Sequence, residues 1–229
     1  MSTPLIHDER VQKFRDIDIY PVTAEALSNG RSDFDVLDGI IAGGARVIQL
    51  RDKMSSVREL YSKAKRFRDV TAANEVLLII NDHIDIAIAV DADGVHLGQD
   101  DFPAAIARAM IPDKIMGCST HTLEEAEQAE RDGADYVNIG PIYATGTKQG
   151  LHTFLGPEMI TRIAPHLSVP FTVMGGIKQS NLPDVLAAGA ARIAVVTAIT
   201  QAPDIAAAVR DFRGQINSTA PTLNESVAS

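Results

Sequence analysis

The sequence is short of cysteine, of basic charge and of long apolar runs, and each shortage excludes a class of protein. One cysteine, Cys118, in 229 residues allows no disulfide within the chain and no zinc site built on cysteines. A net charge of -9, from 21 basic and 30 acidic residues, argues against a general binder of nucleic acids or acidic membranes. No apolar run is long enough to span a bilayer, and the opening MSTPLIHDERVQKFRD lacks the apolar core of a signal peptide. We therefore expect a cytoplasmic globular protein.

Short β-branched runs alternate with longer, alanine-rich helical patterns along the chain. Strands are expected at Ile17–Thr23, Arg46–Arg51, Val76–Asp82, Gly94–Gly98, Lys114–Ser119, Tyr136–Gly140, Pro170–Gly176 and Arg192–Ala198. Helices are expected at Val57–Ala73, Leu123–Arg131, Pro157–Ile163, Asn181–Ala188 and Pro203–Phe212, and Thr122 with Glu125 reads as a capping box. This alternation predicts a parallel sheet with helical crossovers.

Four similar segments of small residues separate a helical pattern from the strand that follows it. They are Gly43–Val47, Asp91–Val95, Asp132–Val137 and Ala188–Ile193. Their spacing of roughly two βα units gives eight strands, the number that closes a TIM (β/α)8 barrel. The alternative, an open Rossmann-type sheet, lacks a Gly-x-Gly-x-x-Gly after an early strand. We expect an N-terminal extension over residues 1–16, one barrel domain over 17–216 and a disordered tail over 217–229.

Polar residues gather where the expected strands end, while the opposite ends are mostly apolar or glycine. The strand-end residues in chain order are Gln49, Arg51 and Lys53, then Asn81 and Asp82, then Gln99, Asp100 and Asp101, then Ser119, Thr120 and His121. In a TIM barrel the chemistry lies at the C-terminal ends of the strands, and a phosphate site often follows strands seven and eight. This rim is therefore the expected functional site.

Two neighbouring strands each end on carboxylates, which would repel one another without a cation. Asp82 follows one strand, and the pair Asp100-Asp101 follows the next. Oxygen ligands without sulfur suit Mg²⁺, which binds one or two carboxylates together with substrate phosphates. The alternative is that each aspartate is a helix N-cap, since each precedes a helical pattern.

Cations and glycines on the same rim predict phosphate binding. Arg51, Lys53 and Lys148 could hold a diphosphate, although a lysine in a loop is often only a solvated charge. Gly175-Gly176 lets the backbone amides approach an anion, with Val196-Thr197 on the next strand, although a tight turn also explains a glycine. Two phosphate sites on one rim suggest two phosphorylated substrates.

The motifs VIQLRDK, IINDHIDIAIAVDADGVHLGQDD, GCSTHT, GADYVNIGPIYATGTK, VMGGI and AVVTAI together resemble those of the thiamine phosphate synthase family. The resemblance extends from Ile19 to Phe212, with the motifs in order and suitably spaced. It implies a TIM-barrel transferase of thiamine biosynthesis. Such an enzyme joins hydroxymethylpyrimidine diphosphate to thiazole phosphate and releases diphosphate, with Mg²⁺ assisting.

By motif position the resemblance implies that Asp82 and Asp101 bind Mg²⁺, Asp101 because the family's acid is the second residue after the glutamine. The implied substrate contacts are Gln49, Arg51, Lys53 and Asn81 for the pyrimidine diphosphate, Ser119 and Lys148 for its diphosphate, and Thr145, Thr147, Gly176, Val196 and Thr197 for the thiazole phosphate. The implied catalytic residues are Arg51, Lys53, Ser119 and Lys148. The expected partners are these small phosphorylated molecules, with no nucleic acid and no membrane, and a homo-oligomer stays open.

Two other functions fit parts of this pattern. A related thiazole tautomerase would use His121 as its proton carrier, and the Leu151–Leu155 loop resembles that enzyme more than the proline-rich loop of many synthases. A catalytically silent barrel that senses thiazole or thiamine phosphate could keep Gly175-Gly176 and lose Arg51 or the acids. The complete set of acids and cations favours the synthase.

Overall fold

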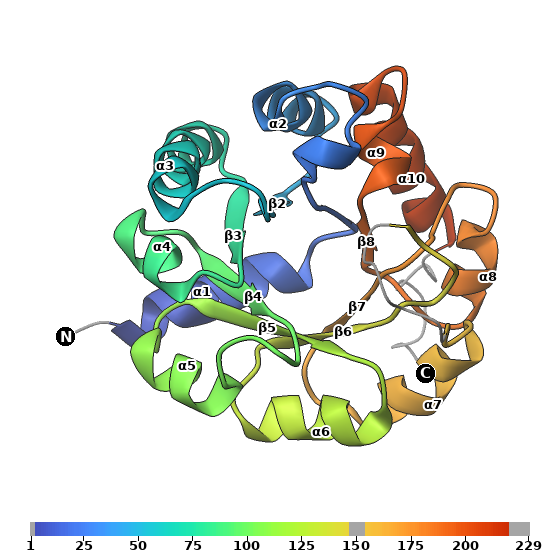
Figure 1. Cartoon of the computed structure of the whole chain (residues 1–229). Helices are drawn as coiled ribbons and strands as arrows, with labels where there is room; N and C mark the ends of the chain where they lie inside the picture. The colour runs from blue at the N-terminus through green and yellow to red at the C-terminus, as the bar shows by residue number, and fades with distance from the viewer. Residues whose placement is uncertain (1–2, 147–153, 220–229) are drawn as a thin grey trace, which may run out of the picture.

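Eight parallel strands form a ring, and helices lie around the outside of it (Figure 1). The computed structural model describes residues 3–146 and 154–219. The strands are β1 (Ile19–Pro21), β2 (Val47–Leu50), β3 (Leu77–Asn81), β4 (Gly94–Leu97), β5 (Ile115–Thr120), β6 (Tyr136–Ile139), β7 (Phe171–Val173) and β8 (Ile193–Val195). They follow one another in the order β1, β8, β7, β6, β5, β4, β3, β2. A parallel bridge between Val22 and Gln49 joins β1 to β2. The predicted TIM barrel is confirmed.

The helices follow the strands as βα units, with one helix before the first strand. They are α1 (Thr3–Arg15), α2 (Asp33–Ala42), α3 (Val57–Ala73), α4 (Ile84–Ala89), α5 (Ala104–Met110), α6 (Leu123–Arg131), α7 (Glu158–Ile163), α8 (Leu182–Ala187), α9 (Thr197–Thr200) and α10 (Ile205–Thr219), with short 3-10 turns η1 (Glu25–Leu27) and η2 (Ala164–His166). Capping boxes start α2 at Ser32 and α3 at Ser56. Among the described residues, no helix is both long and apolar enough to cross a membrane.

The strands' period of two sends alternate side chains to two separate cores. Ile48 and Leu50 of β2 point outward into the large core between the strands and the helices. Val47 joins a smaller core inside the ring, and Gln49 also points inward, where its amide bonds Tyr20. Side chains therefore fill the interior of the ring, and a cavity can form only at its C-terminal rim.

The four segments of small residues lie between a helix and a strand, as predicted. In each, one residue has a positive φ: Gly44 (83°), Asp91 (50°), Gly133 (89°) and Gly189 (97°). This left-handed conformation ends a helix and turns the chain back towards the sheet, and glycine adopts it without steric cost. The repeated pattern therefore reflects one repeated turn.

The N-terminal ends of the strands carry the buried acids Asp18 and Asp93 and the partly buried Asp135, which corrects the expectation that this rim is mostly apolar or glycine. Each acid accepts a hydrogen bond from a strand amide and is paired with an arginine. The pairs are Asp18 with Arg213 (2.9 Å), Asp93 with Arg10 (3.3 Å) and Asp135 with Arg108 (2.9 Å). Because all three charges are compensated, this rim stabilises the barrel, whereas the acids of the other rim face a cavity.

Seven of the eight strands are shorter than expected from the sequence, β5 being the exception, and three further details differ. Thr197 begins α9, because the backbone leaves the strand conformation at Val196, where ψ is -91°. Thr122 caps α6 by accepting from the Glu125 amide, but the Glu125 carboxylate accepts from the amide of His121, so the capping box is incomplete. The last helix, α10, continues to Thr219 and includes the first residues of the expected tail. Residues 220–229 lie outside the described chain.

Candidate active site

A cavity of about 260 Å³ opens at the C-terminal rim of the barrel. All the predicted site residues that the structure describes line it: Gln49, Arg51, Lys53, Asn81, Asp82, Asp101, Ser119, Thr145, Gly176, Val196 and Thr197. The alternative proton carrier, His121, also lines it. Thr147, Lys148 and the Leu151–Thr153 part of the predicted loop lie outside the described residues. Side chains from at least six strand ends therefore meet in one space.

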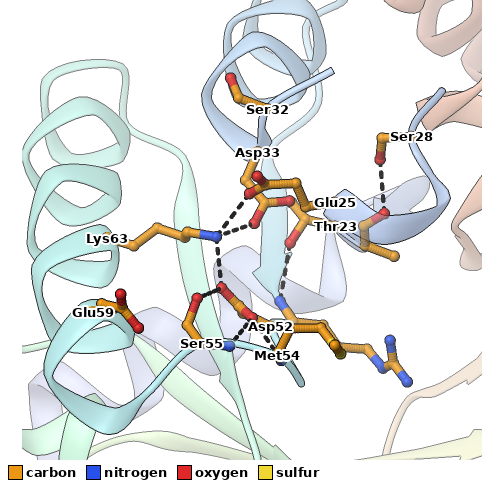
Figure 2. A network of polar contacts seen from close by, with 12 residues as sticks. Thr23, Glu25, Ser28, Ser32, Asp33, Asp52, Met54, Ser55, Glu59 and Lys63 are labelled. Carbon is orange, nitrogen blue, oxygen red and sulfur yellow. Dashed lines mark hydrogen bonds and ion pairs between the residues drawn. The ribbon is translucent and has the colours of Figure 1, made fainter. Parts of the chain in front are cut away.

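The loop after β2 presents Arg51 and Lys53 to the cavity and is fixed by a cluster of charges behind it (Figure 2). Lys63 of α3 donates to Asp52 (2.6 Å), Asp33 (2.8 Å) and Glu25 (2.9 Å). Asp52 also accepts from the amides of Met54 and Ser55, both at 3.0 Å. The residue between the two cations is thus tied to the barrel wall.

The charges of this cluster influence one another's ionisation. Burial alone would raise the pKa of Asp52, but hydrogen bonds from Lys63 and Ser55 outweigh it and hold the pKa well below its usual range. Burial raises the pKa of Asp33 to about 6, with the Glu25 carboxylate adding to the rise and the ammonium group of Lys63 opposing it. The carboxylates also hold the pKa of Lys63 above its usual range, so Lys63 stays charged.

Asp82 and Asp101 come together on the cavity wall. Burial is the largest cause that raises the pKa of Asp82, and the neighbouring carboxylate of Asp101 raises this pKa further. The ion pair with Lys53 opposes the rise. Asp101 accepts from the amide of Gly98 at 2.7 Å, which orients its carboxylate. Two carboxylates and one ammonium group are therefore close enough to act on each other electrostatically.

The helix-cap interpretation of these two acids is wrong. The N-cap of α4 is His83 and that of α5 is Pro103, and neither helix start has a side-chain cap. Asp82 has a φ of 61°, a left-handed conformation that aspartate tolerates better than most residues. Asp100 is exposed, whereas Asp101 lines the cavity, which agrees with the choice of Asp101. Within residues 3–146 and 154–219, no three His, Cys, Asp or Glu side chains gather as ligands of one metal ion.

The glycine pair after β7 lies against the loop that follows β6. Gly175 and Gly176 have φ values of 107° and 63°. A Cβ on Gly176 would collide with the carbonyl oxygen of Ala144, and one on Gly175 would lie 2.5 Å from Cβ of Pro141. At both positions the positive φ and the close neighbours exclude a side chain, as the turn interpretation expects. An anion nest formed by these amides stays a prediction.

The end of β5 carries a serine and a histidine with fixed neighbours. The Ser119 hydroxyl is 2.9 Å from Nε2 of His96, and the Ser119 carbonyl accepts from Gln99 at 2.6 Å. His121 donates through Nδ1 to the carbonyl of Gly140 at 2.5 Å. His121 thus fastens the loop after β6 while it lines the cavity.

Sequence reasoning missed three polar residues of the cavity wall: His96, Asn138 and Lys178. His96 lies in the middle of β4, and Asn138 in β6 accepts from Thr172 at 2.8 Å. For His96 and Asn138 the available signal was the strand period of two, which places a polar residue of an apolar strand on the inner face of the ring. Lys178 lies in the loop after β7, where that period gives no signal. Cys118 is buried, and burial raises the pKa of its thiol to about 12, so it is not a nucleophile of this site.

A TIM barrel whose C-terminal rim joins paired acids, cations and a glycine turn in one cavity is typical of enzymes that act on small phosphorylated molecules. Residues 19–199 match the family described as thiamine monophosphate synthase. The chain belongs to this family.

Individual relatives agree with this assignment. A thiamine-phosphate synthase of Chloroflexus aurantiacus is 48% identical over 201 residues, which cover 88% of this chain and 93% of the relative. One from Methanospirillum hungatei is 46% identical and covers 86% of this chain and 96% of its own length. The solved structure of a thiamine phosphate pyrophosphorylase from Pyrococcus furiosus superimposes with a TM-score of 0.83 at 33% identity, over 90% of this chain and 99% of that chain.

Proposed function

We propose that this enzyme condenses 4-amino-2-methyl-5-hydroxymethylpyrimidine diphosphate with thiazole phosphate, forming thiamine phosphate and releasing diphosphate. The observation that carries the assignment is the meeting of Asp82, Asp101 and Lys53 at one cavity in a chain that belongs to the thiamine monophosphate synthase family. The substrates are small phosphorylated molecules, and the cavity offers both charge signs that such ligands and their counter-ion need.

The reaction exchanges one bond for another. The bond between the pyrimidine methylene carbon and the diphosphate oxygen breaks, and its electron pair leaves with the diphosphate. The thiazole nitrogen then gives its lone pair to the methylene carbon and forms the new carbon–nitrogen bond. The ring amino group stabilises the positive charge in between, so no protein nucleophile is required.

The cations of the rim hold the leaving group. Arg51 offers a planar fork that matches a phosphate, and its amide donates to Thr23 Oγ1 at 3.0 Å, which fixes the start of the loop. Lys53 is half exposed at the cavity, where its ammonium group would contact the leaving diphosphate. Gln49 and Asn81 line the cavity wall beside them and would contact the pyrimidine. Lys148 lies outside the described residues, and its role at the diphosphate stays a prediction.

The acids fit a magnesium ion. Asp82 and Asp101 supply hard oxygen donors, and their mutual repulsion, which contributes to the raised pKa of Asp82, would be relieved by a divalent cation. When bound there, Mg²⁺ would neutralise part of the negative charge that develops on the departing diphosphate. Lys53, already paired with Asp82, is placed to move to the phosphate oxygens when the acids take the metal.

The second substrate is proposed to bind across the cavity. Thr145 and Gly176 lie on one side, and Val196 and Thr197 lie at the start of α9. Together with Thr147 they would hold the thiazole phosphate, whose ring then faces the methylene carbon. The two anionic groups would thus approach from opposite parts of the rim.

The test is direct synthesis. Purified protein with Mg²⁺ and both substrates is expected to form thiamine phosphate and diphosphate in equal amounts, measured by chromatography, and to form neither when one substrate is omitted. Interconversion of thiazole tautomers without any thiamine phosphate would instead assign the tautomerase activity, with His121 as the proton carrier.

A further inference from the structure

A chain of hydrogen bonds crosses the interior of the barrel and ends at the active-site serine. Its members come from five different strands. In order they are Gln49 Nε2 to Tyr20 Oη (2.8 Å), Tyr20 Oη to Tyr136 Oη (2.9 Å), Tyr136 Oη to His96 Nδ1 (2.9 Å) and His96 Nε2 to Ser119 Oγ (2.9 Å). Both ends, Gln49 and Ser119, line the cavity, while neither tyrosine is among its lining residues.

The middle of this chain is closed off from water. Tyr20 is 1% exposed and Tyr136 is fully buried. Phe14 of α1 stacks on Tyr136 with ring centroids 4.1 Å apart and meets Tyr20 edge-on at 5.8 Å. A Cβ on Gly117 would collide with the phenol ring of Tyr136, so glycine at this position of β5 leaves space for that ring. Because water is excluded, the hydrogen bonds keep their strength and their direction.

One direction of the chain gives both tyrosine hydrogens an acceptor. Tyr20 accepts from the amide nitrogen of Gln49, and among the described residues its own hydroxyl hydrogen then finds its acceptor in Tyr136. Tyr136 in turn donates to Nδ1 of His96, which leaves the ring hydrogen on Nε2. The His96 ring is buried with a hydroxyl 2.9 Å from each nitrogen, and a neutral imidazole has one donor and one acceptor to match them. Nε2 therefore donates to Ser119, and the serine's own hydrogen is left to point elsewhere.

We propose that Tyr20, Tyr136 and His96 are positioning residues that commit the Ser119 hydroxyl to donate a hydrogen bond into the cavity. The acceptor there is an oxygen of the substrate's diphosphate, which gains negative charge as the bond to carbon breaks. This role rests on the proposed function, because it takes Ser119 as a contact of the leaving group. When Ser119 accepts a hydrogen bond from His96, its own hydroxyl hydrogen does not take part in that bond. This hydrogen is therefore available to be donated to the substrate.

The direction of the chain is tested in the wild-type protein without any substrate. We expect the ¹⁵N spectrum of His96 to show a neutral ring with hydrogen on Nε2 and an unprotonated, hydrogen-bonded Nδ1. Hydrogen on Nδ1 would reverse the hydrogen bonds between Tyr136, His96 and Ser119 and overturn the inference. This measurement does not depend on catalysis, so its outcome is separate from that of the synthesis assay.

The consequence for catalysis is tested by Tyr136→Phe. We expect kcat to fall about tenfold, as for one weakened hydrogen bond to a charged group, with little change in KM for thiazole phosphate. Tyr143→Phe is the matched control, because that hydroxyl is also buried but has no hydrogen-bond partner within the described part of the chain. Its kcat is expected to stay within about twofold of wild type.

A double-mutant cycle separates positioning from mere support of the fold. If Tyr136 acts through the serine, Tyr136→Phe causes no further loss of kcat in a Ser119→Ala background. An equal loss in both backgrounds would overturn the inference. Tyr20→Phe keeps the bond between Tyr136 and His96, and is expected to show a smaller fall in kcat that also disappears in the Ser119→Ala background. It serves in place of Tyr136→Phe if that variant does not fold.

Discussion

At the residue scale, the two rims use the same residue types for different purposes. Asp18 is buried and paired with Arg213, and its pKa is lowered because the Ile19 amide and Arg213 outweigh the effect of burial. Asp82 faces a cavity beside another acid, and its pKa is raised. A paired acid with a lowered pKa stabilises the fold, whereas an acid with a like-charged neighbour at a cavity is poised to bind a cation.

Two arginine substitutions are expected to separate these purposes. Arg51→Ala should lower kcat/KM about 100-fold, since two hydrogen bonds to a phosphate are lost, and should hardly change Tm. Arg213→Ala leaves Asp18 without its main partner and should lower the unfolding free energy by about 2 kcal/mol while kcat stays unchanged. Calorimetry and steady-state kinetics on both variants check this. A loss of stability in Arg51→Ala at undiminished activity would make Arg51 a structural residue.

At the scale of elements, the loop after β2 owes its position to α3 rather than to its own sequence. Lys63 lies on α3 and holds Asp52 in the loop, Asp33 at the start of α2 and Glu25 in η1 (Figure 2). One ammonium group thus connects three elements directly behind the cations of the site. A motif scan sees Arg51 and Lys53 but not this support, because the contacts depend on how the helices pack around the ring.

Removing this ammonium group is expected to affect both stability and catalysis. Lys63→Met leaves the buried carboxylates of Asp33 and Asp52 without their cation, and should lower the unfolding free energy by about 3 kcal/mol at pH 7. The KM for the pyrimidine diphosphate should rise, because the loop is no longer fixed. Lys65→Met, an exposed position on the same helix, is the control. Equal stability of the two variants would contradict a structural role for the cluster.

The raised pKa of Asp33 predicts a pH dependence of stability. Its folded-state pKa of about 6 lies above the ordinary value of 3.8, so the folded protein binds more protons than the unfolded chain between these values. This contribution to the unfolding free energy is greatest below the lower value and is lost as pH rises through 6. Asp33→Asn removes this pH-dependent contribution. The difference in unfolding free energy, variant minus wild type, should therefore be larger at pH 7 than at pH 4, by up to about 3 kcal/mol. Denaturant titrations that show a constant difference would contradict this.

At the scale of the whole molecule, the sequence predicts most of the ring and the position of the site. Each turn of small residues is a local feature that a short stretch of sequence reveals. The polar residues at the strand ends can likewise be recognised in the sequence. The sequence does not reveal contacts that form only when the barrel closes. The acid–arginine pairs of the opposite rim and the hydrogen bonds from Tyr20 to Ser119 are of this kind, because they join residues far apart in sequence. The α1 helix, expected only as an extension, places Phe14 against the tyrosines inside the ring.

The central proposal for the whole enzyme is that Asp82, after β3, and Asp101, after β4, would together bind a magnesium ion. The most direct measurement is the rate of thiamine phosphate formation against Mg²⁺ concentration for wild type, Asp101→Asn and Asp100→Asn, with EDTA as the zero point. We expect no product in EDTA, a fall in kcat/KM of about 100-fold or more for Asp101→Asn, and a change within about twofold for the exposed Asp100→Asn. Undiminished synthesis in EDTA, or an Asp101→Asn variant as active as Asp100→Asn, would contradict a metal site at these two acids.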